Sequence, residues 1–173
     1  MTDGGGGGPG GQWAQGNQNV QVHTVAAGAS ISVSFGGRER RVPLQPAIVP
    51  VGRNVRSPAR LMRARSGALP FLARSGLLTG LHEWMADPEP FSGYLVGGRG
   101  GSGKTRLAVE MCRAAERDGW LCGLLEGAAE PAAIEALAGV PTARLVVVDY
   151  AESRAEQLVV LLPVLAEQAT TAS

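Results

Sequence analysis

One stretch, residues 98–105 with the sequence GRGGSGKT, constrains the fold of this chain more than any other. It fits the pattern G-x-x-x-x-G-K-[ST] of a phosphate-binding P-loop, whose glycines let the backbone curl around a phosphate with its N–H groups pointing inward. The pattern is informative only between a strand and a helix. Apolar residues 91–96 precede it, and the residues after it place apolar side chains on one helical face: Leu107, Met111 and Ala115. The sequence therefore predicts a strand, a P-loop and a helix from Lys104 to about Arg117.

The side chains of this loop have separate expected roles. Lys104 is expected to act in catalysis by reaching the β- and γ-phosphates of a nucleotide, and the Thr105 hydroxyl is expected to ligate Mg²⁺. Lys104 is the only lysine of the chain, although arginine is frequent, which argues against a chance match. Arg99 is expected to face solvent. The predicted nucleotide-binding set is Gly98, Arg99, Gly100, Gly101, Ser102, Gly103, Lys104 and Thr105.

A second motif lies about 40 residues downstream, where the apolar run 145–148 ends in Asp149. Such a run predicts a strand buried on both faces of a parallel sheet, and ligands bind at the carboxyl ends of such strands. This is the Walker B arrangement, in which Asp149 holds Mg²⁺ opposite Thr105 and Glu152 polarises an attacking water. An apolar run that ends in Asp is weak evidence for nucleotide binding by itself, but it is strong evidence when a P-loop precedes it at this distance. Between the two motifs the sequence predicts a strand at 120–125 and a short helix at 131–137.

The segments GGRGGSGKTRLAVE and VVVDYAESR resemble the bacterial STAND class of signalling ATPases, which is related to the NACHT and NB-ARC groups. The likeness covers residues 70–162. It extends to residues 70–74, which resemble a segment that borders the nucleotide base, although Ala73 replaces the usual glycine and weakens the case for Arg74. The resemblance implies ATP or ADP with Mg²⁺ as ligands. It also implies a switch in which ADP holds a closed state and ATP permits self-oligomerisation and signalling.

The chain departs from this family after Glu152. In the family a fourth strand, which carries a γ-phosphate sensor, lies between the P-loop strand and the Walker B strand. Here helically spaced leucines follow, with Pro163 expected to bend or restart the helix. We therefore expect an α/β P-loop NTPase sheet limited to its first three core strands, forming the N-terminal part of a larger switch protein. Little or no turnover is expected, because no sensor arginine or arginine finger would stabilise the transition state.

Four segments are predicted along the chain. Residues 1–16 form a disordered glycine-rich tail. Residues 17–37 alternate apolar and polar residues and can form a β-hairpin that ends at Gly36–Gly37. Residues 38–69 combine arginines with prolines and predict an extended linker. Residues 70–173 are the partial P-loop domain, with a helix at about 74–85 before the loop.

Composition limits the partners. A net charge of +1 gives no overall attraction to nucleic acid, and no apolar run is long enough to span a bilayer. The first residues lack the features of a secretory signal, so a cytoplasmic protein is expected. Cys112 and Cys122 are predicted to be reduced and buried, and the two histidines lie too far apart to suggest a metal site.

Two alternatives to the switch remain open. A small-molecule or nucleoside kinase would need an arginine-bearing lid after the Walker B strand, where only Arg154 follows. A non-catalytic interaction module would use residues 17–69 to bind a partner and keep the P-loop as a remnant. ATP is favoured over GTP by the family resemblance, since a guanine-reading N-K-x-D would need a second lysine.

Overall fold

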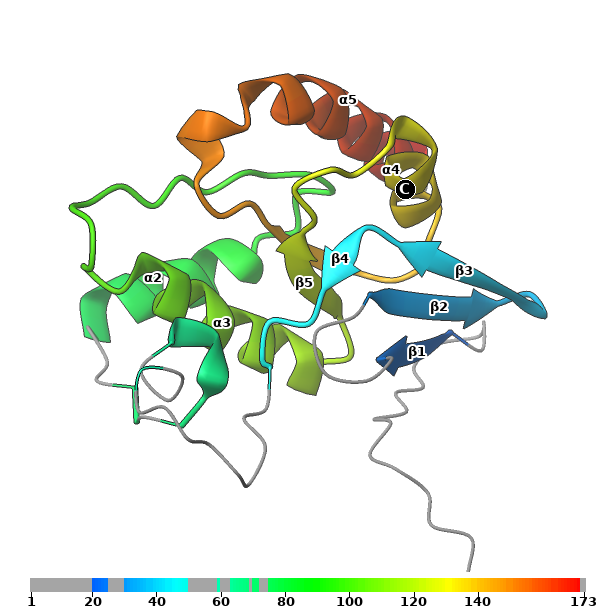
Figure 1. Cartoon of the computed structure of the whole chain (residues 1–173). Coiled ribbons are helices and arrows are strands. Elements are labelled where there is room, and N and C mark those ends of the chain that lie inside the picture. Colours follow the sequence, from blue (N-terminus) through cyan, green and yellow to red (C-terminus); the bar gives the residue numbers. More distant parts are fainter. Residues whose placement is uncertain are drawn as a thin grey trace, which may run out of the picture.

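The computed structural model describes residues 20–24, 30–49, 59, 63–68, 70–71 and 75–171. Within these ranges the fold is mixed α/β, with two three-stranded sheets and four α-helices (Figure 1). The N-terminal sheet is antiparallel, in the order β1 (Gln21–Thr24), β2 (Ile31–Phe35) and β3 (Arg38–Val42). The central sheet has the order β4 (Leu44–Gln45), β5 (Leu121–Leu125) and β6 (Arg144–Val147). In it β4 runs antiparallel to β5, and β5 runs parallel to β6.

The helices follow the sequence predictions closely. They are α2 (Ser75–Met85), α3 (Lys104–Arg117), α4 (Pro131–Ala138) and α5 (Ala155–Thr171), with 3₁₀ turns η1 (Ala64–Ser66) and η2 (Ala151–Ser153). Helix α3 ends where predicted, because the Asp118 N–H caps it and Gly119 takes a φ of +81°. Pro163 lies inside α5, which continues past it as one helix.

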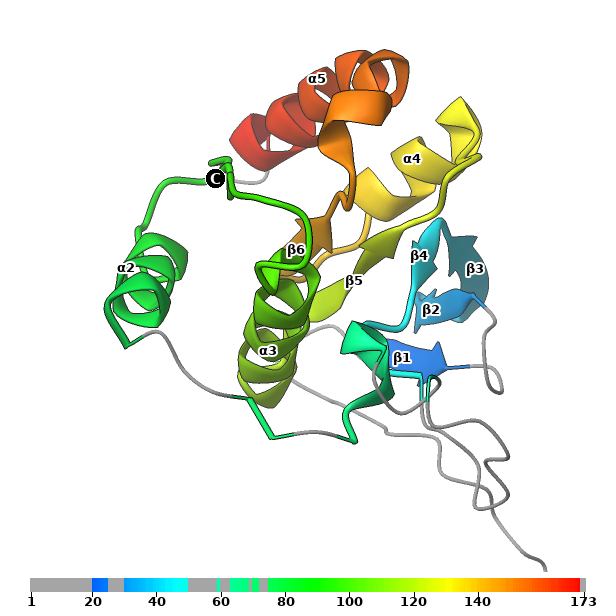
Figure 2. The same ribbon diagram turned by 60° about the vertical axis from the view of Figure 1, so that its left-hand side comes forward.

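The central sheet is covered on both faces, and the alternating side chains of β5 reach both cores. Cys122 and Leu124 pack with α3 and α2, whereas Leu121 and Leu125 pack with α4, α5 and the N-terminal sheet. Figure 2 shows α3 with α2 outside it on one side of β5 and β6, and α4 with α5 on the other. This arrangement leaves the carboxyl end of β6 beside the start of α3.

The N-terminal sheet corrects two predictions. Gly36 and Gly37 do not end a hairpin but form the turn from β2 to β3, with φ of +57° and +73°. Residues 38–42 and 44–45, expected in an extended linker, are strands β3 and β4. Only Val42 of β3 is buried, and the other four residues of the strand are exposed, so the sequence shows no apolar alternation there. Charged side chains of this kind are common in a strand at the edge of a sheet. The predicted tail, residues 1–16, lies outside the described residues.

The predicted P-loop strand is also wrong in this structure. Residues 91–96 form no strand, and Leu95 is 86% exposed. A strand requires a neighbour for its backbone hydrogen bonds, and within the described ranges β6 pairs only with β5. Instead, Tyr94 contacts Trp84 of α2 with ring centroids 5.5 Å apart, and Val96 packs against the core beneath α3. A parallel pair, β5 and β6, is therefore present, but a P-loop strand beside it is not.

Two further predictions can be compared with the structure. Cys112 and Cys122 are free and buried, as expected, and burial raises the pKa of Cys112 to about 12 and that of Cys122 as well. Among the described helices, none combines the length and apolar character needed to cross a bilayer.

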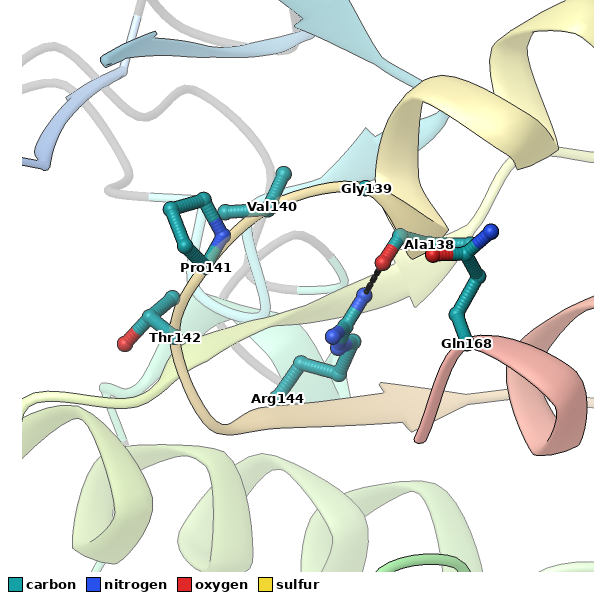
Figure 3. Close-up of a pocket in the computed structure, with 7 residues that line it drawn as sticks. All are labelled: Ala138, Gly139, Val140, Pro141, Thr142, Arg144 and Gln168. Atoms are coloured by element: carbon teal, nitrogen blue, oxygen red, sulfur yellow. Dashed lines mark hydrogen bonds between the residues drawn. The ribbon is translucent and has the colours of Figure 1, made fainter. Parts of the chain in front are cut away.

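Arg144 joins β6 to the end of α4. Its Nη1 donates hydrogen bonds to the carbonyl oxygen of Leu137, at 2.6 Å, and to that of Ala138 (Figure 3). These carbonyls belong to the last turn of α4, where helical carbonyls lack partners within the helix. The guanidinium thus caps α4, and its burial lowers the pKa of Arg144.

Gly123, in the middle of β5, permits the close approach of β4. A Cβ at Gly123 would lie 2.7 Å from the Gln45 carbonyl oxygen and 3.0 Å from the Leu44 Cβ. We expect Gly123→Ala to lower the free energy of unfolding by about 1–3 kcal/mol through overpacking. The matched control is Gly80→Ala in α2, where a Cβ meets nothing within 4 Å and a gain of about 0.5–1 kcal/mol is expected. Urea denaturation measures both, and equal stabilities would contradict the close approach of β4 to β5.

Candidate functional site

The glycine-rich loop before α3 adopts the backbone conformations that its sequence suggests. Gly98, Gly101 and Gly103 have φ of +150°, +73° and +89°, values that other residues rarely adopt. At Gly98 a Cβ would also lie 3.1 Å from the Ser102 Oγ. The loop closes onto α3, because the Gly103 carbonyl accepts the first helical hydrogen bond from the Leu107 N–H at 2.9 Å. The first N–H groups of α3 therefore face the loop without partners in the helix.

Lys104, the first residue of α3, turns its ammonium group back over this loop. Its Nζ donates hydrogen bonds to the carbonyl oxygens of Gly98, at 2.8 Å, and Arg99, at 3.1 Å. The ammonium is thus held against the loop backbone at the start of the helix, where the first N–H groups have no acceptor within the helix. A positive charge at the N-terminus of a helix favours an anion.

The structure brings Thr105 and Asp149 together, although they lie 44 residues apart. The Thr105 hydroxyl lies 3.2 Å from Oδ1 and 3.1 Å from Oδ2 of Asp149. Thr105 is in the first turn of α3, and Asp149 follows the end of β6 by two residues. Both side chains are half-buried. A carboxylate and a hydroxyl in contact are oxygen ligands of the kind that Mg²⁺ takes alongside water and phosphate.

The residue after Asp149 has a strained backbone. Tyr150 has a φ of +55°, and it is the only non-glycine residue with a positive φ in the described part of the chain. Its N–H donates a hydrogen bond to Asp149 Oδ1 at 3.2 Å, which fixes the direction of the carboxylate. Such strain costs of order 1–3 kcal/mol and clusters at functional positions.

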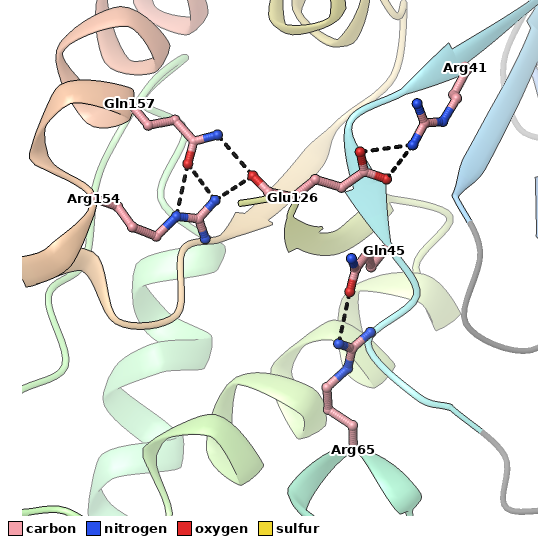
Figure 4. Close-up of polar contacts among 6 residues, drawn as sticks. All are labelled: Arg41, Gln45, Arg65, Glu126, Arg154 and Gln157. Carbon is pink, nitrogen blue, oxygen red and sulfur yellow. Dashed lines mark hydrogen bonds and ion pairs between the residues drawn. The ribbon is translucent and has the colours of Figure 1, made fainter. Parts of the chain in front are cut away.

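Two arginines, drawn with their hydrogen-bond partners in Figure 4, interact with the charge of Asp149 without forming an ion pair with it. Arg65, from η1, donates to the Gln45 side chain at 3.0 Å and to the Pro46 carbonyl. Arg154 donates to the Leu125 carbonyl at 3.1 Å and to the Glu126 carbonyl. Burial lowers the pKa of each arginine, and the charge of Asp149 opposes that effect. Both guanidinium groups thus contribute positive potential where Asp149 lies.

The Arg154 contacts also connect this region to the N-terminal sheet. Gln157 donates to the Glu126 carbonyl at 2.8 Å, and the Glu126 carboxylate accepts from Arg41 of β3 at 2.8 and 2.9 Å (Figure 4). The Arg41–Glu126 pair is largely exposed on the arginine side, so it contributes little energy by itself. The pair joins β3 to Glu126, the residue after β5.

Glu152 is not brought to the loop. It lies on η2, is exposed, and makes no hydrogen bond or ion pair with a described residue. Its catalytic role stays a prediction. The Arg99 side chain faces solvent, as predicted, while Arg74 and Ala73 lie outside the described residues. No group of three or more His, Cys, Asp or Glu side chains suited to a metal gathers within the described ranges.

Sequence reasoning did not assign the roles of Tyr150, Arg65 and Arg154. No local pattern marks a non-glycine residue in the left-handed region, and Arg65 was one of many arginines in the expected linker. Only the tertiary fold brings η1 and the start of α5 close to Asp149.

A comparison of the chain with protein-family models, with curated proteins and with solved structures finds no match.

Proposed function

We propose that this chain binds a nucleoside triphosphate together with Mg²⁺, with ATP preferred to GTP. The observation that carries the proposal is the contact of Thr105 with Asp149, because it joins the end of the P-loop motif to the Walker B carboxylate. Residues 98–105 would hold the phosphates through backbone N–H groups and Lys104. Thr105 and Asp149 would hold the metal, directly or through water.

The loop conformation supports this assignment independently. Three glycines of the loop have positive φ, and the Lys104 ammonium lies over this loop at the start of a 14-residue helix. The N–H groups of the loop and the ammonium thus bring several hydrogen-bond donors to one place. A purely structural Thr–Asp hydrogen bond would require neither these glycines nor a lysine turned over the loop. Both features fit a phosphate group with a bound divalent cation.

We further propose that the chain is part of a P-loop switch of the STAND type, cytoplasmic and able to self-associate in its active form. The parallel pairing of β5 with β6 and the packing of α3 on them support a P-loop sheet. Turnover should be small, since Glu152 is exposed, whereas the Asp149 carboxylate accepts a hydrogen bond from the Tyr150 N–H. Arg154 is committed to the carbonyls of residues 125 and 126, which disfavours its use as a kinase lid.

The proposal is tested by the metal dependence of nucleotide binding. We expect Asp149→Asn to weaken binding of a fluorescent ATP analogue in Mg²⁺ by about 10- to 100-fold, the range typical of groups that position a metal. In EDTA the variant and the wild-type chain should bind the ATP analogue with equal affinity, because no Mg²⁺ is present for residue 149 to hold. Titration by fluorescence anisotropy measures both conditions.

The matched control is Asp118→Asn, at the opposite end of α3. It removes the same charge at the end of the helix that is remote from Thr105, and it should leave both affinities unchanged. Thr105→Val should reproduce the Mg²⁺-specific loss. Absence of saturable binding by the folded wild-type chain, or an equal loss in EDTA, would contradict the proposed metal site.

A further inference from the structure

A second polar pocket lies at the opposite end of β6 from Asp149. It has a volume of about 420 Å³ and is lined by Ala138, Gly139, Val140, Pro141, Thr142, Arg144 and Gln168. Figure 3 shows Arg144 from β6 and Gln168 from α5 pointing toward the end of α4, with the loop 139–142 beside them. Asp149 lies five positions after Arg144, or about 16 Å along an extended chain, so this pocket is distinct from the P-loop.

Only Nη1 of the Arg144 guanidinium takes part in the cap of α4. Both of its hydrogen bonds to carbonyl oxygens come from Nη1, and it forms no ion pair with a described residue. The Nε and Nη2 edge keeps three N–H donors without described partners. These nitrogens are not sealed in the core, since the buried unpartnered side-chain atoms of the described chain are Arg65 Nε and Trp84 Nε1. This edge is the one that binds a planar carboxylate through two parallel hydrogen bonds.

The other polar side chains of the pocket are neutral. Thr142 and Gln168 line it, and neither side chain has a hydrogen-bond partner among the described residues. In Figure 3 the Gln168 amide lies beside Ala138, whereas the Thr142 hydroxyl points away from Arg144. No carboxylate lines the pocket, so the charge of Arg144 is not neutralised there. One guanidinium with one neutral amide matches a single negative charge better than a phosphate dianion. Ala138 and Pro141 add an apolar wall.

We propose that this pocket binds a carboxylate carried on a short apolar body, with Arg144 as the charged anchor. The carboxylate would face Nε and Nη2 of Arg144, and the Gln168 amide would donate to a remaining lone pair. Nη1 stays on the α4 carbonyls and shields the ligand from the negative end of that helix. Two sources share this chemistry: a free small carboxylic acid and the C-terminal carboxylate of a peptide.

The test uses the full chain labelled with ¹⁵N and follows the Arg144 Nε–H and the amides of residues 139, 140 and 142 by NMR. Sodium butyrate is the probe, and butyramide, sodium chloride and inorganic phosphate are compared at constant ionic strength. We expect saturable shifts with butyrate alone. Equal shifts with butyramide, tighter binding of phosphate, or no saturation with butyrate would overturn the proposal.

Variants locate the binding. Arg144→Gln should weaken butyrate binding roughly tenfold or more, because it removes hydrogen bonds to a charged group. Arg117→Gln is the matched control, since Arg117 also donates to a backbone carbonyl but lies at the end of α3. Because Arg144→Gln also uncaps α4, Gln168→Ala provides a second test that leaves the cap intact. It should weaken binding severalfold, whereas Thr142→Val should leave binding unchanged, because the Thr142 hydroxyl points away from Arg144. Unchanged affinity in Gln168→Ala, or an equal loss in Thr142→Val, would contradict the proposed pocket.

A final comparison distinguishes a free small carboxylic acid from the C-terminal carboxylate of a peptide. Acetyl-Gly-Val with a free C-terminus and its amidated form are titrated beside butyrate. Tighter binding of the free peptide than of butyrate assigns the pocket to a peptide end, and tighter binding of butyrate assigns it to a small acid. Equal binding of the free and amidated peptides would overturn the role of the carboxylate.

Discussion

Lys104→Ala is expected to abolish measurable nucleotide binding while leaving the fold intact. Two hydrogen bonds from an ammonium to charged phosphates contribute about 1.5–3 kcal/mol each, so their loss should weaken binding by at least roughly 100-fold. The side chain makes its described hydrogen bonds to the carbonyls of Gly98 and Arg99, within the loop itself. Removing it therefore disturbs no contact of the core. Titration of a fluorescent ATP analogue with Mg²⁺ gives the affinity, and circular dichroism reports the fold.

Arg117→Ala serves as the control for this loss. It removes a positive charge from the last turn of the same helix, whose first turn carries Lys104. Because α3 has 14 residues, the two ends are about 20 Å apart, beyond the screening length at physiological salt. Retained binding in Arg117→Ala with loss in Lys104→Ala supports the P-loop. An equal loss in both variants would indicate nonspecific charge attraction and contradict the proposed site.

The segment from α3 to β6 could be predicted from sequence because its signals are local. A glycine-rich loop, a helix cap at Asp118 and an apolar run ending in Asp149 are each set by neighbouring residues. The contact of Thr105 with Asp149 agrees with the prediction that they lie opposite each other, and it depends on packing. Helix α3 packs on β5 and β6, so its first turn lies at the carboxyl end of β6, where Asp149 follows.

The strands outside that segment depend on distant partners, and sequence reasoning failed there. Residues 91–96 contain the apolar run 94–96, yet within the described ranges they pair with no strand. Residues 44–45 look like linker, yet they pair with β5 because Gly123 leaves room for them. In both cases hydrogen bonding between segments decides the structure, and local propensity does not report it.

The surroundings of Asp149 were unpredictable for the same reason. Arg65 and Arg154 lie on opposite sides of Asp149 in sequence, 84 residues before and 5 residues after it. Their positive charges act on one carboxylate only after η1 packs against α3 and α5 folds back over β5. Sequence reasoning predicted that Thr105 and Asp149 lie opposite each other, but it did not predict the charges around them.

Deletion of residues 1–66 is expected to unfold the rest of the chain. The N-terminal sheet and β4 supply Val20, Ile31, Val33, Val42 and Leu44 to the core that contains Leu121 and Leu137. Burial of each such side chain contributes about 1.5–3 kcal/mol, and together they approach the 5–15 kcal/mol stability typical of a whole domain. Loss of helical circular dichroism and of cooperative urea unfolding would be the observed result. Deletion of residues 1–16 is the control, because the described core takes no residue from that range.

This deletion separates the two views of the N-terminal part. A partner-binding arm could be removed without harm, and nucleotide binding would then survive in residues 67–173. The structure favours the opposite outcome, because Val42 and Leu44 are fully buried on either side of Pro43, where the chain passes from one sheet to the other. A folded fragment 67–173 that binds ATP would show that the N-terminal sheet is a separable module. Its interaction with a partner would then become the leading hypothesis for residues 17–69.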